Sequence, residues 1–120
     1  MKLELVLPLL VAGMSLRVAH WQTRSYSEHK VYETLYGLID AFMDKYVEVS
    51  QGKGADRVEF PGDTVVPLFN YGGAADQAEG VRELIKALVA EKANLEPELS
   101  NMVDDLVANL EQGLFLLTLE

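Results

Sequence analysis

The amino-acid sequence predicts an all-α protein, a bundle of four helices in which one connection is long. Three observations lead to this prediction. Apolar residues recur at three- and four-residue steps in four segments, which is the period of a helix face. These segments cover about 70% of the chain, roughly twice the usual share of helix. Residues 52–75 break the pattern with glycines and prolines, as expected for the crossover of a bundle with one long connection.

The composition indicates a single globular domain over residues 1–120. Hydrophobic residues make up 49% of the chain and charged residues 24%, which supports a modest core and excludes a disordered protein. The absence of cysteine excludes disulfides, thiolate zinc sites and iron–sulfur clusters. The net charge of −9 argues against nucleic-acid binding, because the chain offers no dense cationic surface. Metal cations or cationic partners fit this charge better.

The first helix is expected over residues 3–23. Gly13, Leu16 and His20 are spaced to share one of its faces. Pro8 has no backbone N–H to donate, so the helix either begins or bends there.

The segment Leu5–Gly13 also resembles a short signal-peptide core behind Lys2. Glu4 and Pro8 interrupt it, and cleavage near its end would remove half of a good helix. No run approaches the roughly 18 apolar residues that span a bilayer. We therefore expect no membrane association, and a cytoplasmic protein or one encoded by a phage or virus.

The second helix, over residues 26–51, has the clearest pattern. Ser25 and Glu28 form a capping box, with Ser27 as a competing N-cap, and Gly52 ends the helix. A helix of this length measures roughly 37 Å. Its periodic apolar residues are Val31, Tyr32, Leu35, Leu38, Ile39, Phe42, Met43, Tyr46 and Val47.

The other two helices follow the crossover of residues 52–75, which is long enough to be functional or packed on the bundle. Within the crossover, residues 58–60 and 64–69 suit short extended pieces or a brief helix. The third helix is expected over residues 76–94, with Asp76 and Glu79 as a second capping box. The fourth is expected over residues 97–119, beginning near Pro97 or Ser100, and its apolar face carries Leu99, Val103, Leu106, Leu110, Leu114 and Leu117.

An acidic stripe headed by a histidine follows one side of the second helix. Its members fall within a sector of roughly 100°, and such stripes are usually only the solvated face of a helix. Few lysines are interleaved here, however, so the stripe repels itself unless a positive charge lies on it. Aromatic residues also flank the stripe, which is unusual for a helix face that is simply exposed to solvent. The stripe consists of His29, Glu33, Asp40, Asp44 and Glu48.

The spacing of the stripe permits a metal site shared by two chains. His29 and Glu33 are one turn apart, as are Asp44 and Glu48, but the two pairs lie roughly 16 Å apart along the helix. A second copy of the helix, antiparallel across a two-fold axis, places the partner's Glu48 opposite His29 and the partner's Asp44 opposite Glu33. Such an isologous dimer makes two identical sites. Equal spacing alone would allow this pairing, so it permits a site without proving one.

His20 can add a second imidazole, because a short connection folds the end of the first helix back toward the second. Imidazoles with carboxylates are ligands for iron, manganese or zinc. A histidine beside Trp21 is more often simply part of a packed turn, and the sequence leaves both readings open.

Together these residues resemble the ferroxidase motif of the Dps-like miniferritins. His20-Trp21 is similar to the His-Trp that ends the first helix in that family. His29-x-x-x-Glu33 is similar to the His-x-x-x-Asp that begins the family's second helix. Asp44-x-x-x-Glu48 is similar to the Asp-x-x-x-Glu that follows eleven residues after the first acid. The resemblance implies a ferritin-like four-helix bundle with the centre at a two-fold interface. It also implies that His20, His29, Glu33, Asp44 and Glu48 bind ferrous iron for oxidation by peroxide or oxygen, and that the iron is stored or detoxified in a homo-oligomeric shell.

This chain departs from the family in several respects. The loop between the histidines is shorter, position 33 is Glu where the family has Asp, and no lysine-rich N-terminal tail is present. The chain is also short, which argues against a standard twelve-subunit shell. Two alternatives remain open. One is a structural or interaction protein, for example a phage or virus component, without redox turnover. The other is a helical bundle with a static zinc or manganese site.

Overall fold

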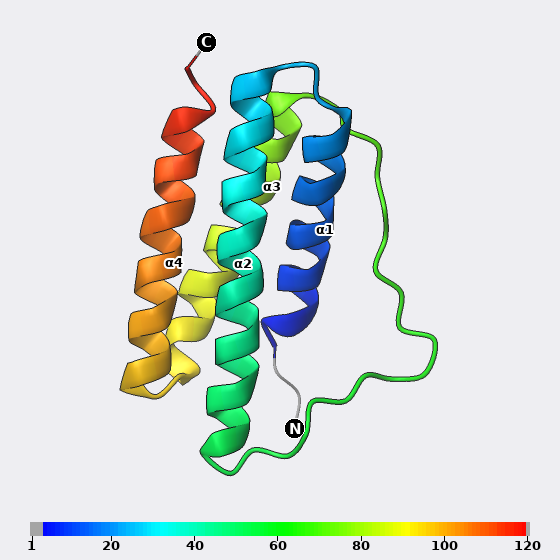
Figure 1. Ribbon diagram of the computed structural model, residues 1–120. Helices are drawn as coiled ribbons and strands as arrows, with labels where there is room; N and C mark the ends of the chain where they lie inside the picture. The colour runs from blue at the N-terminus through cyan, green and yellow to red at the C-terminus, as the bar shows by residue number, and fades with distance from the viewer. Residues whose placement is uncertain (1–3, 120) are drawn as a thin grey trace.

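Four α-helices build the protein in the computed structural model, which describes residues 4–119 (Figure 1). They are α1 (Val6–Gln22), α2 (Tyr26–Gly52), α3 (Ala74–Glu91) and α4 (Pro97–Leu116), with the short 3₁₀ helix η1 (Lys92–Asn94) after α3. No strand occurs in this described part of the chain. The all-helical class predicted from the sequence is therefore confirmed.

Helices α1 and α2 form one antiparallel hairpin, and α3 and α4 form a second (Figure 1). The connection of residues 53–73 runs along the outside of α1 and returns the chain to the end where α2 began, so that α2 and α3 point the same way (Figure 1). The connection contains neither a strand nor a helix. The brief helix suggested within it does not form, and any extended pieces in it are not paired into strands.

The core lies between the four helices and takes residues from each of them. Helix α2 contributes at the predicted three- and four-residue steps, with Tyr32 and Ile39 fully buried. Helix α1 is apolar nearly all round; it packs against α2 and α3, and the connection runs along its outer side (Figure 1). The buried cluster also contains Leu9 and Leu16 from α1, Val81, Leu84 and Leu88 from α3, and Leu99, Val103, Leu106 and Leu110 from α4.

The start of α2 agrees with the sequence prediction, whereas the start of α3 does not. Ser25 is the N-cap of α2, and its hydroxyl accepts a hydrogen bond from the backbone N–H of Glu28 at 3.3 Å. The predicted capping box at Asp76 is wrong, because α3 begins two residues earlier, at Ala74, with Gly73 as its N-cap. Gly73 has a φ of 114°, a backbone conformation that residues other than glycine rarely adopt. Asp76 instead lies in the first turn, where its charge suits the helix dipole.

The remaining helix ends differ from the prediction by a few residues. Helix α1 begins at Val6, so Pro8 occupies the first turn, where its missing N–H would have no partner in any case. The predicted start at residue 3 lies outside the described residues. Helix α4 ends at Leu116 and not at residue 119. Within residues 4–119, none of the helices combines the length and the apolar character needed to cross a membrane.

Two helix-interior glycines make a matched test of this packing. A Cβ at Gly113 would lie 2.4 Å from Cδ2 of the buried Leu35, whereas a Cβ at Gly80 would have nothing within 4 Å. Gly80→Ala should raise the free energy of unfolding by about 0.5–1 kcal/mol, because alanine favours the helix. Gly113→Ala should lower it by about 1–3 kcal/mol through overpacking. Urea denaturation measures both, and equal effects of the two substitutions would contradict the close approach of α2 and α4.

Candidate metal centre

Three predicted ligands meet at the end of the α1–α2 hairpin. His20 lies in the last turn of α1, and His29 and Glu33 lie in the first two turns of α2. One ring nitrogen of each histidine and one carboxylate oxygen of Glu33 lie within 4.8 Å of one another. The histidines are half-buried and Glu33 is exposed. Among residues 4–119 this is the one group of three or more such side chains close enough to hold a metal ion.

The two histidines hold each other through a reciprocal pair of hydrogen bonds. Nδ1 of His20 lies 2.9 Å from the carbonyl oxygen of His29, and Nδ1 of His29 lies 2.7 Å from the carbonyl oxygen of His20. A carbonyl oxygen can only accept, so both Nδ1 atoms donate a proton. The lone pair of each neutral ring is therefore on Nε2, the free nitrogen. Metal-binding histidines are commonly oriented in this way by a second hydrogen bond.

Ring contacts further restrict the two imidazoles. Their centroids lie 3.7 Å apart with 16° between the planes, and the Tyr36 ring forms a T-shaped contact with His20 at 5.5 Å between centroids. The Tyr26 ring stacks on the His29 ring with 6.3 Å between centroids. The two imidazoles are thus held in place before any ligand binds. Trp21, the other residue of the His-Trp pair, is 66% exposed and does not pack in the turn.

The other two predicted ligands lie elsewhere on α2. Asp44 and Glu48 are exposed, further along the helix, and one chain does not bring them to the histidines. This separation is what the spacing required, because roughly 16 Å of helix divides the two pairs. Their meeting with a second chain across a two-fold axis stays a prediction. Asp40, in the same stripe, turns toward α1 and forms an ion pair with Arg17 at 3.0 Å.

A carboxylate–tyrosine cluster beside the centre was missed by the sequence analysis. The hydroxyls of Tyr32 and Tyr71 both donate to Oε1 of Glu28, the former at 3.0 Å, and their oxygens lie 2.9 Å from each other. The hydrogen bond from Tyr71 holds the pKa of the Glu28 carboxyl below its ordinary value. Burial raises the pKa of both tyrosines, so they stay protonated as donors. The capping-box pattern predicts that the Glu28 side chain accepts a hydrogen bond from the backbone at the start of the helix. Nothing in the local sequence indicates its contact with Tyr71.

This cluster fastens the end of the long connection to the hairpin that carries the centre. Gln22 adds two more bonds, accepting from the backbone N–H of Tyr71 at 2.7 Å and donating to the side chain of Asn70 at 3.1 Å. Thr23 donates to Glu28 at 3.4 Å. The connection therefore ends in a defined place next to the histidines.

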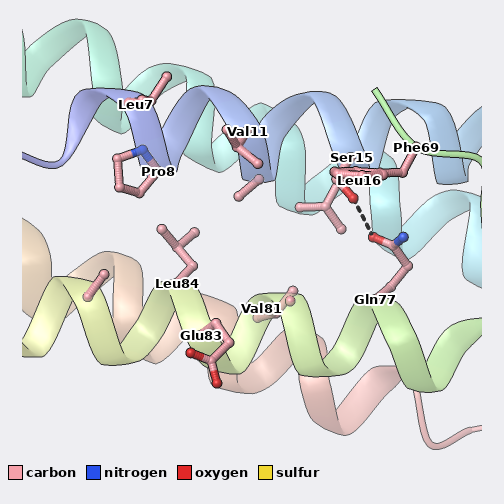
Figure 2. A pocket seen from close by; sticks show the side chains of 13 residues that line it. Leu7, Pro8, Val11, Ser15, Leu16, Phe69, Gln77, Val81, Glu83 and Leu84 are labelled. Carbon is pink, nitrogen blue, oxygen red and sulfur yellow. Dashed lines mark hydrogen bonds between the residues drawn. The ribbon is translucent and has the colours of Figure 1, made fainter. Parts of the chain in front are cut away.

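An apolar groove of about 450 Å³ lies between α1 and α3, away from the centre (Figure 2). Leu7, Pro8, Val11 and Leu84 line it, and Ser15 and Gln77 point toward each other across one end at 3.4 Å (Figure 2). Glu83 points away from it (Figure 2). The groove gathers no set of titratable or metal-binding groups, so the histidine centre is the better candidate for chemistry.

With this bundle and its centre described, the chain can be placed among known proteins. It belongs to a family of unknown function, DUF5856, whose model matches residues 20–117. That range begins at His20 and includes the other predicted ligands. The chain is also 27% identical to the uncharacterized 14.6 kDa protein in the mobD-ri intergenic region of Enterobacteria phage T4. This match covers 93% of the chain and 84% of the relative. No solved structure matches it.

The Glu28 cluster predicts a pH-dependent contribution to stability. Because the folded pKa of Glu28 lies below its ordinary value of 4.5, the stabilisation is present above that value and is lost as pH falls through the folded pKa. Tyr71→Phe should therefore destabilise the fold by about 1–2 kcal/mol at pH 7, and this difference should shrink toward pH 3. Urea denaturation across this range measures it.

Tyr26→Phe is the matched control, since Tyr26 is 76% exposed and outside the cluster; it should have little effect at either pH. A Tyr71→Phe difference that stays constant with pH would contradict the role of the Glu28 carboxylate.

Proposed function

We propose that this protein binds ferrous iron at the histidine centre and oxidises it, as a Dps-like miniferritin that stores or detoxifies the iron. The observation that carries the proposal is the reciprocal histidine clamp, which engages both Nδ1 atoms and leaves both Nε2 lone pairs free. One ring nitrogen of each histidine and one carboxylate oxygen of Glu33 lie within 4.8 Å of one another. Two imidazoles and a carboxylate suit iron, with zinc or manganese as substitutes. The charge of −9 favours a cation as substrate.

The order of the helices supports a ferritin-like bundle. Two helices form an antiparallel hairpin, a connection returns the chain along the bundle, and a second hairpin follows (Figure 1). Ferritin-like bundles use one long crossover in this way and build metal sites from side chains on their helices.

The exposed face of α2 supports a site completed by a second chain. Glu33, Asp44 and Glu48 lie on this face and are all exposed. Gly37 lies at the centre of the same face, exposed, with nothing within 4 Å of an added Cβ. A helix-interior glycine costs about 1 kcal/mol relative to alanine, and no contact within the chain explains this one. A second α2 crossing here, antiparallel about an axis between Leu38 and Ile39, would use the space and deliver the partner's Asp44 and the partner's Glu48.

The chemistry then follows from the ligand types. Ferrous iron is the substrate and binds through His20, His29 and Glu33, with the acids of the second chain completing the site. Each ferrous ion gives one electron, so two ferrous ions and two protons convert one peroxide molecule to two water molecules, and four of each convert one oxygen molecule to two water molecules. Hard carboxylate oxygens stabilise the ferric product. The hydrogen bonds from the two Nδ1 atoms hold the imidazoles in one orientation, so little reorganisation of the rings is needed when iron binds.

A second candidate is a structural or interaction protein, such as a phage component, without redox turnover. Two observations favour it. The relative at 27% identity is a phage protein, and large apolar side chains of the connection are exposed, at 47% for Phe60, 72% for Val65, 66% for Leu68 and 61% for Phe69. Such a protein should purify without iron and show no iron-dependent absorbance change.

Stopped-flow absorbance after mixing the protein with ferrous iron and peroxide separates these functions. We expect iron to be oxidised faster with the wild type than in buffer alone. In His29→Ala and Asp44→Ala, the rate should fall at least tenfold while the protein still folds. Asp105→Ala, an exposed acid on α4, should leave the rate unchanged. A wild type no faster than buffer would refute the ferroxidase proposal. Metal bound without oxidation would point to a static zinc or manganese site.

The two-fold pairing makes an independent prediction about Gly37. Gly37→Leu should place a bulky side chain between the two α2 helices and weaken the dimer by about 1–3 kcal/mol, without harming the fold of the monomer. Sedimentation velocity over a range of concentrations measures the association. Gly80→Leu, at the glycine of α3 that also has nothing near an added Cβ, is the control. A wild type that is monomeric throughout, or a dimer indifferent to Gly37→Leu, would contradict the pairing.

A further inference from the structure

Three side chains outside the ligand set fill the α1–α2 interface next to His20. Arg17 lies three residues before His20 on α1, and Tyr36 and Asp40 lie on successive turns of α2. The Arg17 side chain is 29% exposed and that of Asp40 is 44% exposed. They belong neither to the metal ligands nor to the fully buried core, so the proposed function leaves them without a role.

The contacts between them form a continuous series that ends at the His20 ring. Nη2 of Arg17 lies 3.0 Å from Oδ2 of Asp40. The Arg17 guanidinium carbon lies 4.2 Å from the centre of the Tyr36 ring. The Tyr36 ring in turn meets the His20 ring edge-on, with 5.5 Å between centroids and 75° between planes. Each contact is of a recognised favourable kind, namely an ion pair, a cation–π contact and an aromatic edge contact.

The His20 ring needs such support because rotation about its Cβ–ring bond is only weakly restricted. Rotation of an imidazole about its bond to Cβ has broad, roughly two-fold minima, and a flipped ring would exchange the places of its carbon and nitrogen atoms. The hydrogen bond from Nδ1 to the carbonyl of His29 favours one orientation. The T-shaped contact with the Tyr36 ring restricts the His20 ring further, and Arg17 over the Tyr36 ring holds that ring in place.

From this series we propose that Tyr36, Arg17 and Asp40 are positioning residues, which hold the His20 ring with Nε2 free for a metal ion. This role rests on the proposed function, because it assumes that Nε2 of His20 binds a metal ion. Asp40 has a second effect. It neutralises the guanidinium, so that the nearby Arg17 does not repel a cation. This member of the acidic stripe therefore acts on the centre through Arg17 and not as a ligand.

The test uses two readouts on the full chain, one of which requires no metal. Long-range ¹H–¹⁵N spectra of ¹⁵N-labelled protein report which ring nitrogen of each histidine carries the proton. Titration with Co²⁺, followed by its visible absorption, reports metal affinity. The variants are Tyr36→Leu, which removes the ring, and Arg17→Met, which removes the charge but keeps the stem. Tyr36→Phe, which keeps the ring, is the matched control.

We expect a single Nδ1–H form of His20 in the wild type and in Tyr36→Phe. In Tyr36→Leu and Arg17→Met, the His20 signals should move toward an average of the two forms, and Co²⁺ affinity should fall roughly tenfold, as for other residues that orient ligands. Thermal melts identify any variant that is not folded. Should Tyr36→Leu fail to fold, Arg17→Met carries the test.

The outcomes separate this inference from the proposed function. Unchanged His20 signals and unchanged Co²⁺ affinity in folded Tyr36→Leu and Arg17→Met would overturn the positioning role, whatever the wild type does with iron. A wild type that binds no Co²⁺, but whose His20 signals respond to Tyr36→Leu as described, would refute the proposed function and retain the positioning role. Asp40→Asn should lower Co²⁺ affinity while leaving the His20 signals in place. An unchanged Co²⁺ affinity would overturn the proposal that Asp40 neutralises the charge of Arg17.

Discussion

The reciprocal hydrogen bonds between His20 and His29 are the interaction on which the candidate centre depends. Each ring donates to the backbone of the other residue, at 2.9 and 2.7 Å, so the side chains and the two helix ends are held by the same bonds. The carbonyl of His20 belongs to the last turn of α1, where carbonyls have no partner within the helix. The same two bonds therefore close the hairpin and orient both rings.

The long connection contributes to the same end of the bundle. It leaves α2 at the far end, follows α1, and is fastened beside the histidines by Tyr71, which bonds to Glu28 and Gln22 (Figure 1). Two polar clusters thus lie next to each other on one turn, the histidine pair and the Glu28 cluster. Because buried or half-buried polar groups are costly unless they are fully bonded, these bonds fix the relative positions of α1, α2 and the connection at this end of the bundle.

The periodic pattern of the chain was sufficient to predict the all-helical class, the number of helices and the buried face of α2. Apolar residues at helical steps must face a core, and this holds whatever the neighbouring helices are. The same argument predicted that His29 and Glu33 can reach one ion and that Asp44 and Glu48 of the same chain cannot join them there, because both statements depend only on the rise of one helix. The Ser25 cap followed for a similar reason, since the cap is complete within four residues.

The sequence by itself therefore determined those features whose physics is local: helix period, one cap and the spacing of ligands along a single axis. Only the tertiary structure decided which groups meet across helices. It moved the start of α3 to Ala74. It also brought Tyr71 to Glu28, turned Asp40 toward Arg17, and paired each histidine with the other's backbone. These three kinds of contact join residues from 9 to 43 positions apart. They depend on how the helices are rotated and offset against one another, which the summed packing of the whole core sets and no local pattern records.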